Sequence, residues 1–182
     1  MKAQIKPLIS ILSILALMSC TVVQGKEDGD SKKIVSAISS SSDLQGTWVS
    51  SCGTYGGQNF IYVASFDKDQ VKFFMMTYLD QNCSQMIDSP ITMVESFRLG
   101  NKITSKEGDV VHEIDYLSSK MYAVIALDNS VSPPALIFTH PTGANFSKAA
   151  ERPTKLWKNP LGIRVKDDNF TLPSAPSAPS AK

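Results

Sequence analysis

Residues 109–127, DVVHEIDYLSSKMYAVIAL, decide how this chain folds. In the first half, apolar and aromatic residues alternate with polar ones. Glu113 and Asp115 are expected to face outward. The residues expected to face inward are Val110, His112, Ile114 and Tyr116. A period of two indicates a β-strand buried on one face. An apolar run follows the short polar pair Ser118-Ser119, so the stretch predicts two antiparallel strands joined by a tight turn.

The central part of the chain repeats this pattern of short β-rich runs separated by Gly, Asp, Asn, Ser and Pro. The predicted strands cover residues 44–52, 58–66, 70–79, 91–99, 102–106, 109–118, 120–127 and 135–140. Because most connections are only a few residues long, sequence neighbours are expected to pair antiparallel. About eight such strands close into an all-β, up-and-down barrel, which removes exposed sheet edges.

Two of the predicted strands suggest how the barrel is filled and covered. In 91–99, the residues on one face are Ile91, Met93, Phe97 and Leu99. Strand 70–79 is apolar on both faces, so its outer side must be covered by the segment after Trp157 or by a partner protein. Residues 146–166 fit either a final strand or a packed extension.

The first twenty residues, MKAQIKPLISILSILALMSC, have the features of an export signal. Two lysines precede an apolar run that is too short to span a bilayer, which needs about 20 apolar residues. The last four residues, Leu17-Met18-Ser19-Cys20, resemble a lipobox. That resemblance implies a bacterial lipoprotein, cleaved before Cys20 and held on a membrane by acyl chains on that cysteine.

An ordinary secretion signal, cleaved after Gly25, is the alternative. A secreted protein could be glycosylated at its Asn-x-Ser/Thr triplets, which begin at Asn82, Asn145 and Asn169. If Cys20 is lipidated, the following Thr21 resembles the enterobacterial pattern that directs lipoproteins to the outer membrane. The expected location is therefore the bacterial cell envelope, with secretion as the second possibility.

The composition of the ends sets the expected domain boundaries. Residues 1–19 are the signal peptide, and residues 20–43 are too polar to repay the entropy of ordering, which predicts a lipidated tether. Residues 44–166 form the barrel domain. Residues 167–182 repeat Pro-Ser-Ala and are expected to be a disordered tail.

Cysteine use and charge restrict the chemistry further. Apart from Cys20, the chain contains Cys52 and Cys83, and an even pair in an exported protein is most simply a disulfide. A metal site is the competing interpretation, but two cysteines without further Cys or His ligands suit zinc poorly. Without the two signal-peptide lysines, 16 basic residues face 17 acidic ones. With no basic block, nucleic acid is not an expected partner.

Three further elements are Gly46-Thr47-Trp48 with Cys52, Tyr78-Leu79-Asp80-Gln81-Asn82-Cys83, and Arg152-Pro153-Thr154. Together they resemble a group of bacterial lipocalin-like lipoproteins. The resemblance covers residues 44–156 and implies a calycin-type barrel in which Trp48 plugs one end and Gly46 lets the chain bend. In lipocalins a late arginine lies over this tryptophan, and Arg152, with Arg164 second, is the candidate for that cation–π contact.

Few residues suggest chemistry. Glu95, His112 and Tyr116 share the inward phase and could form a polar cluster that orients a ligand, unless they sit at a bulge or a rim. Phe73 and Met75 could line an apolar cavity, although such residues are more often core. No catalytic, cofactor or metal motif is present. The leading expectation is a membrane-tethered protein that binds a small hydrophobic ligand. The alternative is a non-catalytic module with a filled barrel and an envelope protein as partner.

Overall fold

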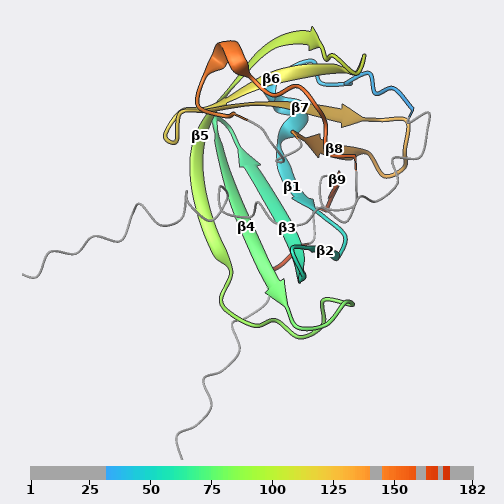
Figure 1. Ribbon diagram of the computed structural model, residues 1–182, viewed down its shortest axis with the longest axis vertical. Helices are drawn as coiled ribbons and strands as arrows, with labels where there is room; N and C mark the ends of the chain where they lie inside the picture. The colour runs from blue at the N-terminus through green and yellow to red at the C-terminus, as the bar shows by residue number, and fades with distance from the viewer. Residues whose placement is uncertain (1–31, 140–144, 159–162, 168–169, 173–182) are drawn as a thin grey trace, which may run out of the picture. The chain divides into compact units, whose positions relative to one another are not determined.

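Nine β-strands form the body of the protein in the computed structural model (Figure 1), which describes residues 32–139, 145–158, 163–167 and 170–172. The strands are β1 (Gly46–Val49), β2 (Gly53–Tyr55), β3 (Gln58–Asp67), β4 (Gln70–Tyr78), β5 (Ile91–Thr104), β6 (Val110–Tyr116), β7 (Met121–Asp128), β8 (Ala135–Phe138) and β9 (Ile163–Lys166). Two 3-10 turns, η1 (Ser41–Leu44) and η2 (Ala149–Glu151), accompany them.

Several predictions lie outside the described residues. They concern the signal peptide, lipidation of Cys20, the tether up to residue 31, and the tail from residue 173 onward. Over the part of the chain that can be described, no helix is long and apolar enough to cross a membrane.

The strands follow one another in antiparallel order and bring the sheet round on itself. The order is β1-β9-β8-β7-β6-β5-β4-β3-β2, and β1 also pairs with β3. Eight strands therefore form a nearly closed barrel, and β2 extends the β3 side beyond it. The predicted all-β antiparallel barrel is confirmed. Figure 1 shows β3 and β4 beside the lower part of the long, curved β5, while β6, β7 and β8 run across its upper part.

The predicted first strand, 44–52, is divided in the structure. Leu44 belongs to η1, and the strand pairing with β3 is interrupted between Val49 and Gly53. At the interruption the Ser50 side-chain oxygen accepts a hydrogen bond from the Tyr62 amide at 2.8 Å. Side-chain bonding of this kind competes with the regular ladder, which explains why periodicity alone did not predict the break.

The two predicted strands 91–99 and 102–106 are one strand, β5. Gly100-Asn101 is not a turn but an irregularity in the β5–β6 ladder, where the pairing shifts between Leu99 and Lys102. A Cβ atom on Gly100 would lie 2.8 Å from the Cβ of Glu113, so only glycine fits. The glycine marks a β-bulge with close backbone approach.

Residues 146–166, which fitted either of two structures, contain both an extension and a final strand. Leu156 forms a bridge to Thr139, and β9 then enters the gap between β8 and β1. The amide of Asp167 donates to the Thr47 carbonyl at 2.7 Å, so the attached region continues past residue 166.

The barrel interior is filled at one end by large apolar side chains. This core contains Ile38, Leu44, Trp48, Ala64, Phe66, Val71, Phe97, Ile114, Tyr116, Ala123, Ile125, Leu127 and Leu136. Trp48 is 1% exposed, and its indole N–H donates to the Leu44 carbonyl at 2.7 Å. Gly46, two residues earlier, has a φ of 102°, a backbone conformation that favours glycine.

Part of the predicted tether belongs to the folded unit, so the boundary at residue 43 is wrong. Ile34 and Ile38 are buried, and the amide of Ile34 donates to the Asp109 carboxylate at 2.9 Å. Asp109 also pairs with Lys158 at 2.7 Å. The residues from Lys33 onward form one unit because this segment covers an outer apolar face of the sheet.

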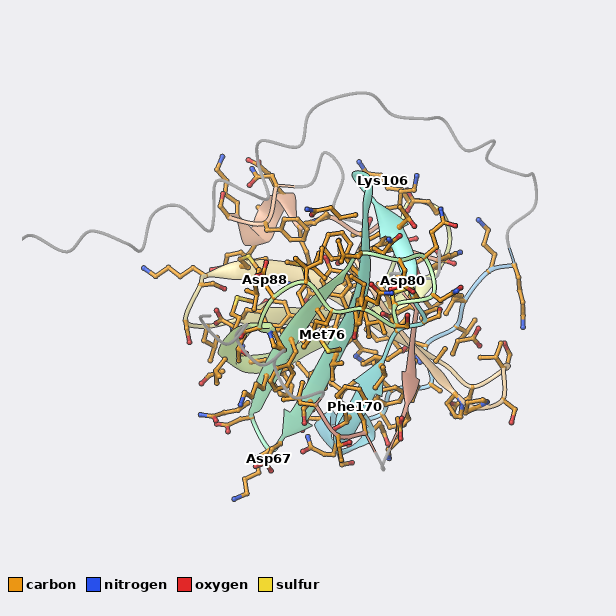
Figure 2. All side chains as sticks on the ribbon, turned by 90° about the horizontal axis from the view of Figure 1, so that it is seen from below. Asp67, Met76, Asp80, Asp88, Lys106 and Phe170 are labelled. Atoms are coloured by element: carbon orange, nitrogen blue, oxygen red, sulfur yellow. A yellow bond between two sulfur atoms is a disulfide. The ribbon has the colours of Figure 1, made fainter. Side chains whose placement is uncertain are left out.

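A second outer face, on β3 and β4, is covered from two directions. Val63, Phe74, Met76 and Tyr78 form a buried cluster with Met86 and Phe170 packed against it. Figure 2 labels Met76 and Phe170, which come from the middle and the end of the chain. The need for a cover over strand 70–79 is confirmed, and Phe170 lies in the segment after Trp157. Because Phe170 packs here, the predicted tail begins too early at residue 167.

The disulfide between Cys52 and Cys83 is present, with a Cα–Cα distance of 5.8 Å. It joins the interruption after β1 to the loop after β4.

We predict that Cys52→Ser lowers the free energy of unfolding by about 3–4 kcal/mol, because the bond closes a loop with a sequence separation of 31 residues. Chemical unfolding of the oxidised protein measures this change. Adding a reductant to the parent protein serves as the control and should lower its stability by a similar amount. Equal stability of the oxidised parent and the variant would contradict the prediction.

Candidate functional site

One end of the barrel interior is lined by apolar side chains that are only partly covered. Phe73 and Met75 of β4 lie on the inner face, because Phe73 contacts the inner residues Tyr116 and Phe138 with ring centroids 5.7 and 6.1 Å apart. Directly paired residues in an antiparallel ladder share a face. Phe73 pairs with Met93, and Met75 pairs with Ile91, so β5 adds two more inner apolar side chains.

These inner residues remain accessible, unlike the core at the other end. Phe73 and Met75 are half-buried, and the exposed fractions of Met93 and Ile91 reach 40% and 51%. Trp48, by contrast, is 1% exposed. The difference arises because β6 pairs with β5 only from Phe97 onward, which leaves the start of β5 without a neighbour on that side.

A tryptophan borders this open end. Trp157 packs with Phe60, and the half-buried Tyr62 and Met75 lie against the same pair. The main-chain amide of Trp157 donates to the Phe138 carbonyl at 2.8 Å, and this bond holds the segment after η2 against β8. We call Tyr62, Phe73, Met75, Ile91, Met93, Phe138 and Trp157 the open-end residues.

The structure does not bring Glu95, His112 and Tyr116 together as one polar cluster. Glu95 is opposite Val71, and its carboxylate accepts a hydrogen bond from the Ser119 amide at 3.1 Å. Tyr116 pairs with Phe97, near Glu95, whereas His112 pairs with Lys102 beyond the bulge. Glu95 and His112 both face inward, but His112 lies opposite Lys102, toward the other end of the long strand β5 from Glu95. The expectation of a three-residue cluster is therefore wrong.

His112 is buried at the other end of the inner face. Its Nδ1 lies 3.5 Å from the Gly100 carbonyl oxygen. Its Nε2 is buried and has no hydrogen-bond partner among the residues described. Over the same residues, no group of three or more His, Cys, Asp or Glu side chains is arranged to hold a metal ion.

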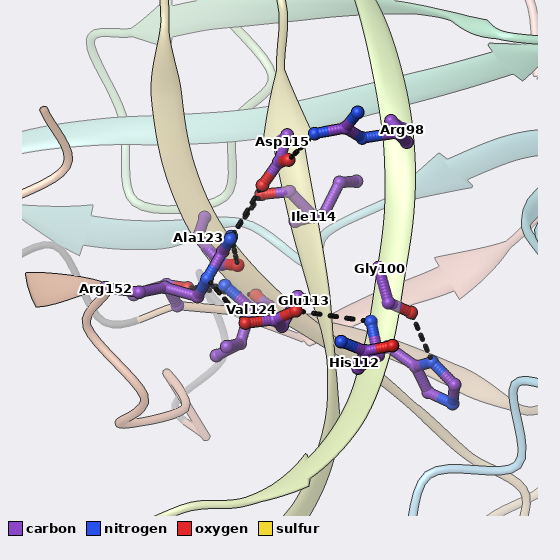
Figure 3. Close-up of polar contacts among 11 residues, drawn as sticks. Arg98, Gly100, His112, Glu113, Ile114, Asp115, Ala123, Val124 and Arg152 are labelled. Atoms are coloured by element: carbon purple, nitrogen blue, oxygen red, sulfur yellow. Dashed lines mark hydrogen bonds and ion pairs between the residues drawn. The ribbon is translucent and has the colours of Figure 1, made fainter. Parts of the chain in front are cut away.

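Arg152 lies against β6 and β7, beside Asp115 and Ala123 (Figure 3), and does not contact Trp48. Its guanidinium pairs with Asp115 at 2.8 Å and with Glu113 at 3.2 Å. It also donates to the carbonyl oxygens of Ile114 and Ala123, at 3.0 Å each. Its aromatic partner is Tyr122, with 5.5 Å between the guanidinium carbon and the ring centroid. The expected contact between Arg152 and Trp48 is therefore wrong, and the side chain of Arg164 lies outside the described residues.

Two arginines share the carboxylate of Asp115. Arg98 pairs with it at 2.8 Å from the exposed side, and Arg152 pairs with it from the buried side. Burial alone would raise the pKa of Asp115, but the hydrogen bonds and charges of both arginines outweigh burial and lower the pKa below its ordinary value. The network joins the segment around η2 to β6 and has the features of a structural clamp rather than of a reactive site.

Of the predicted ligand-lining residues, Phe73 and Met75 are at the open end and Tyr116 contacts it through Phe73. Sequence reasoning did not identify Tyr62, Met93 or Trp157 as part of it. The alternation of 91–99 did place Met93 on the inner face. Its exposure could not be read from the pattern, because it depends on where β6 ends.

No protein-family model matches this chain, and no curated protein or solved structure is significantly similar to it. The function of the protein must therefore be inferred from its fold and its side-chain geometry.

We predict that Arg152→Met destabilises the protein by about 3–5 kcal/mol, because it removes the buried cation that pairs with Glu113 and Asp115 and leaves Asp115 with only the exposed Arg98. Arg98→Met is the matched control and should destabilise the protein much less, because Arg98 is 70% exposed. Urea unfolding measures both changes.

The stabilisation by the arginines requires ionised Asp115. It is complete above the ordinary pKa of an aspartate and is lost as the pH falls through the lowered pKa of the folded state. The difference in stability between parent and Arg152→Met should shrink over that acid range. Equal effects of the two arginine substitutions at neutral pH would contradict the assignment.

Proposed function

We propose that the protein is a lipid-anchored, lipocalin-like binding protein of the bacterial cell envelope, which holds a small hydrophobic ligand at the open end of its barrel. The observation that carries the ligand proposal is the accessibility of inward-facing apolar residues, of which Met93 and Ile91 are 40% and 51% exposed. Binding sites for small molecules are mostly apolar concave surfaces with few polar groups.

The composition of the open end favours a flexible, apolar ligand. Phe73, Phe138 and Tyr62 provide rings, while Met75 and Met93 provide side chains that adapt to irregular shapes. Glu95 is buried on the same face and accepts the Ser119 amide, so it offers a polar group near the apolar surface. A ligand with a long hydrocarbon part and one polar end suits this arrangement.

Attachment to the membrane through Cys20 is supported by the lipobox-like residues alone. The lipidated cysteine would place the barrel at a membrane surface, where hydrophobic ligands are concentrated. Thr21 favours the outer membrane as that surface.

A second candidate function is a non-catalytic interaction module of the envelope. The filled end of the barrel favours it, because Trp48, Ile114 and Leu136 leave little room there. In that case the exposed residues of the open end would contact a protein rather than a small molecule.

Two neighbouring residues of β5 provide a sharp test of ligand binding. Met93 faces inward and Val94 faces outward, and both are exposed, at 40% and 53%. We predict that Met93→Asp weakens binding of a fluorescent long-chain fatty acid by at least about tenfold, since the ligand would then bury a charge. Val94→Asp adds the same charge on the other face and should change the Kd by less than about twofold.

Fluorescence titration of the protein starting at Thr21 measures these Kd values. Native mass spectrometry of the same protein, purified without detergent, should also show a co-purified molecule of small mass. Absence of fatty-acid binding together with empty spectra would reject the ligand and favour the interaction module. Equal effects of the two aspartates would place binding elsewhere.

A further inference from the structure

The first part of β5 has one bonded edge and one open edge. Residues Ile91 to Ser96 pair with β4, whereas pairing with β6 begins at Phe97. Within the described residues, β5 has only β4 and β6 as neighbours in the sheet. Among the residues that the structure describes, the edge of residues 91–95 that faces away from β4 is therefore unpaired.

The direction of the main-chain groups on this edge follows from two hydrogen bonds. The Phe97 amide donates to the Asp69 carbonyl on the β4 side, at 2.8 Å. The Ser96 carbonyl accepts from the Leu117 amide on the opposite side, also at 2.8 Å. In an antiparallel strand, the N–H and C=O of one residue point to the same side, and the side alternates along the chain. Thr92 and Val94 thus direct their N–H and C=O groups to the open edge.

The side chains along this edge are exposed on both faces of the sheet. Ile91, Met93 and Val94 are 51%, 40% and 53% exposed, and Thr92 is exposed as well. Proteins usually protect an open edge with lysine, proline or an inward-pointing charge. The stretch 91–94 contains none of these, and the carboxylate of the following Glu95 is buried and bonded to the Ser119 amide.

We propose that this edge pairs with the same edge of a second copy of the chain, in antiparallel register about Met93. In that register Thr92 of each copy lies opposite Val94 of the other, and each such pair can exchange both of its N–H···O bonds. The two Met93 side chains then form a directly opposed pair on the inner face. A two-fold contact uses the same surface on both copies, as most homodimers do.

Several features of the edge favour a second copy as its occupant. Residues 91–94 are uncharged, and the register places each Glu95 opposite Ile91 of the other copy rather than opposite the second Glu95, so the pairing brings no like charges together. The Glu95 carboxylate stays on the inner face, where it accepts the Ser119 amide. The pairing also ends at Glu95, just before the Ser96 carbonyl that Leu117 occupies, so no existing hydrogen bond is displaced. The contact requires neither a ligand nor lipid on Cys20.

Disulfide cross-linking in the full chain carrying Cys20→Ser, which removes the third cysteine, tests the proposal. Met93→Cys places an unpaired thiol at the two-fold axis, because Cys52 and Cys83 are bonded to each other. Directly opposed residues in such a pair have a Cα separation of about 4.5–5.5 Å, within the range that a disulfide bridges. Mild oxidation should convert Met93→Cys largely to a dimer on a non-reducing gel. Val131→Cys, equally exposed at 44% in the loop after β7, should remain monomeric.

A second set of variants shows whether the main-chain edge is responsible. Adding Thr92→Lys and Val94→Lys to Met93→Cys puts charges opposite one another and should reduce the cross-link at least about fivefold. Two lysines at Val131 and Val35, exposed residues in the loop after β7 and beside Val110, should leave it unchanged. Peptide mapping confirms that Cys52 still pairs with Cys83. Cross-linking at residue 93 no stronger than at residue 131, insensitivity to the edge lysines, or cross-links to other proteins alone would each overturn the proposal.

Discussion

The barrel depends on one strand that belongs to two ladders. β5 pairs with β4 along its first part and with β6 along its second, so its hydrogen bonds join the two halves of the sheet. A strand this long must bend to serve both, and the bulge at Gly100-Asn101 supplies the bend. Glu113 occupies the space that a side chain at residue 100 would need, which ties the bulge to the charged pairs around Arg152. The open end exists for the same reason, because β5 begins before β6 can cover it.

Much of this architecture was accessible from alternation and turn composition. The pairs of strands around Ser118-Ser119 and around Asp67-Lys68-Asp69 were predicted close to their final bounds, and the Cys52–Cys83 disulfide was predicted as well. The errors occur where one local sequence pattern is compatible with two different structures. Gly100-Asn101 looks like a turn but is a bulge, and the polar tether hides Ile34 and Ile38, whose burial depends on distant partners in β6 and β7.

The candidate site was predictable only in part, for a related reason. Phase alone placed Phe73, Met75 and Met93 on the inner face. The end at which they remain uncovered is set by the offset between β4 and β6 along β5, which spans residues far apart in sequence. Arg152 is a second case in which the sequence pattern did not predict the contacts of a side chain. Its position in an Arg-Pro-Thr element suggested a partner in Trp48, but Asp115, Glu113 and two carbonyl oxygens hold it on the outer surface.

The attachment of residues 33–38 affects how a mechanical load enters the protein. Tension on the chain before Lys33 reaches the β5–β6 hairpin first, through the bonds of Ile34 and Val110 and the buried carboxylate of Asp109. Lys158 holds that carboxylate from a third segment, so the load is spread over parts of the chain that are remote in sequence. The strand β1 and its tryptophan lie downstream of this anchorage. A load applied ahead of Lys33 therefore meets these bonds before it reaches the core around Trp48.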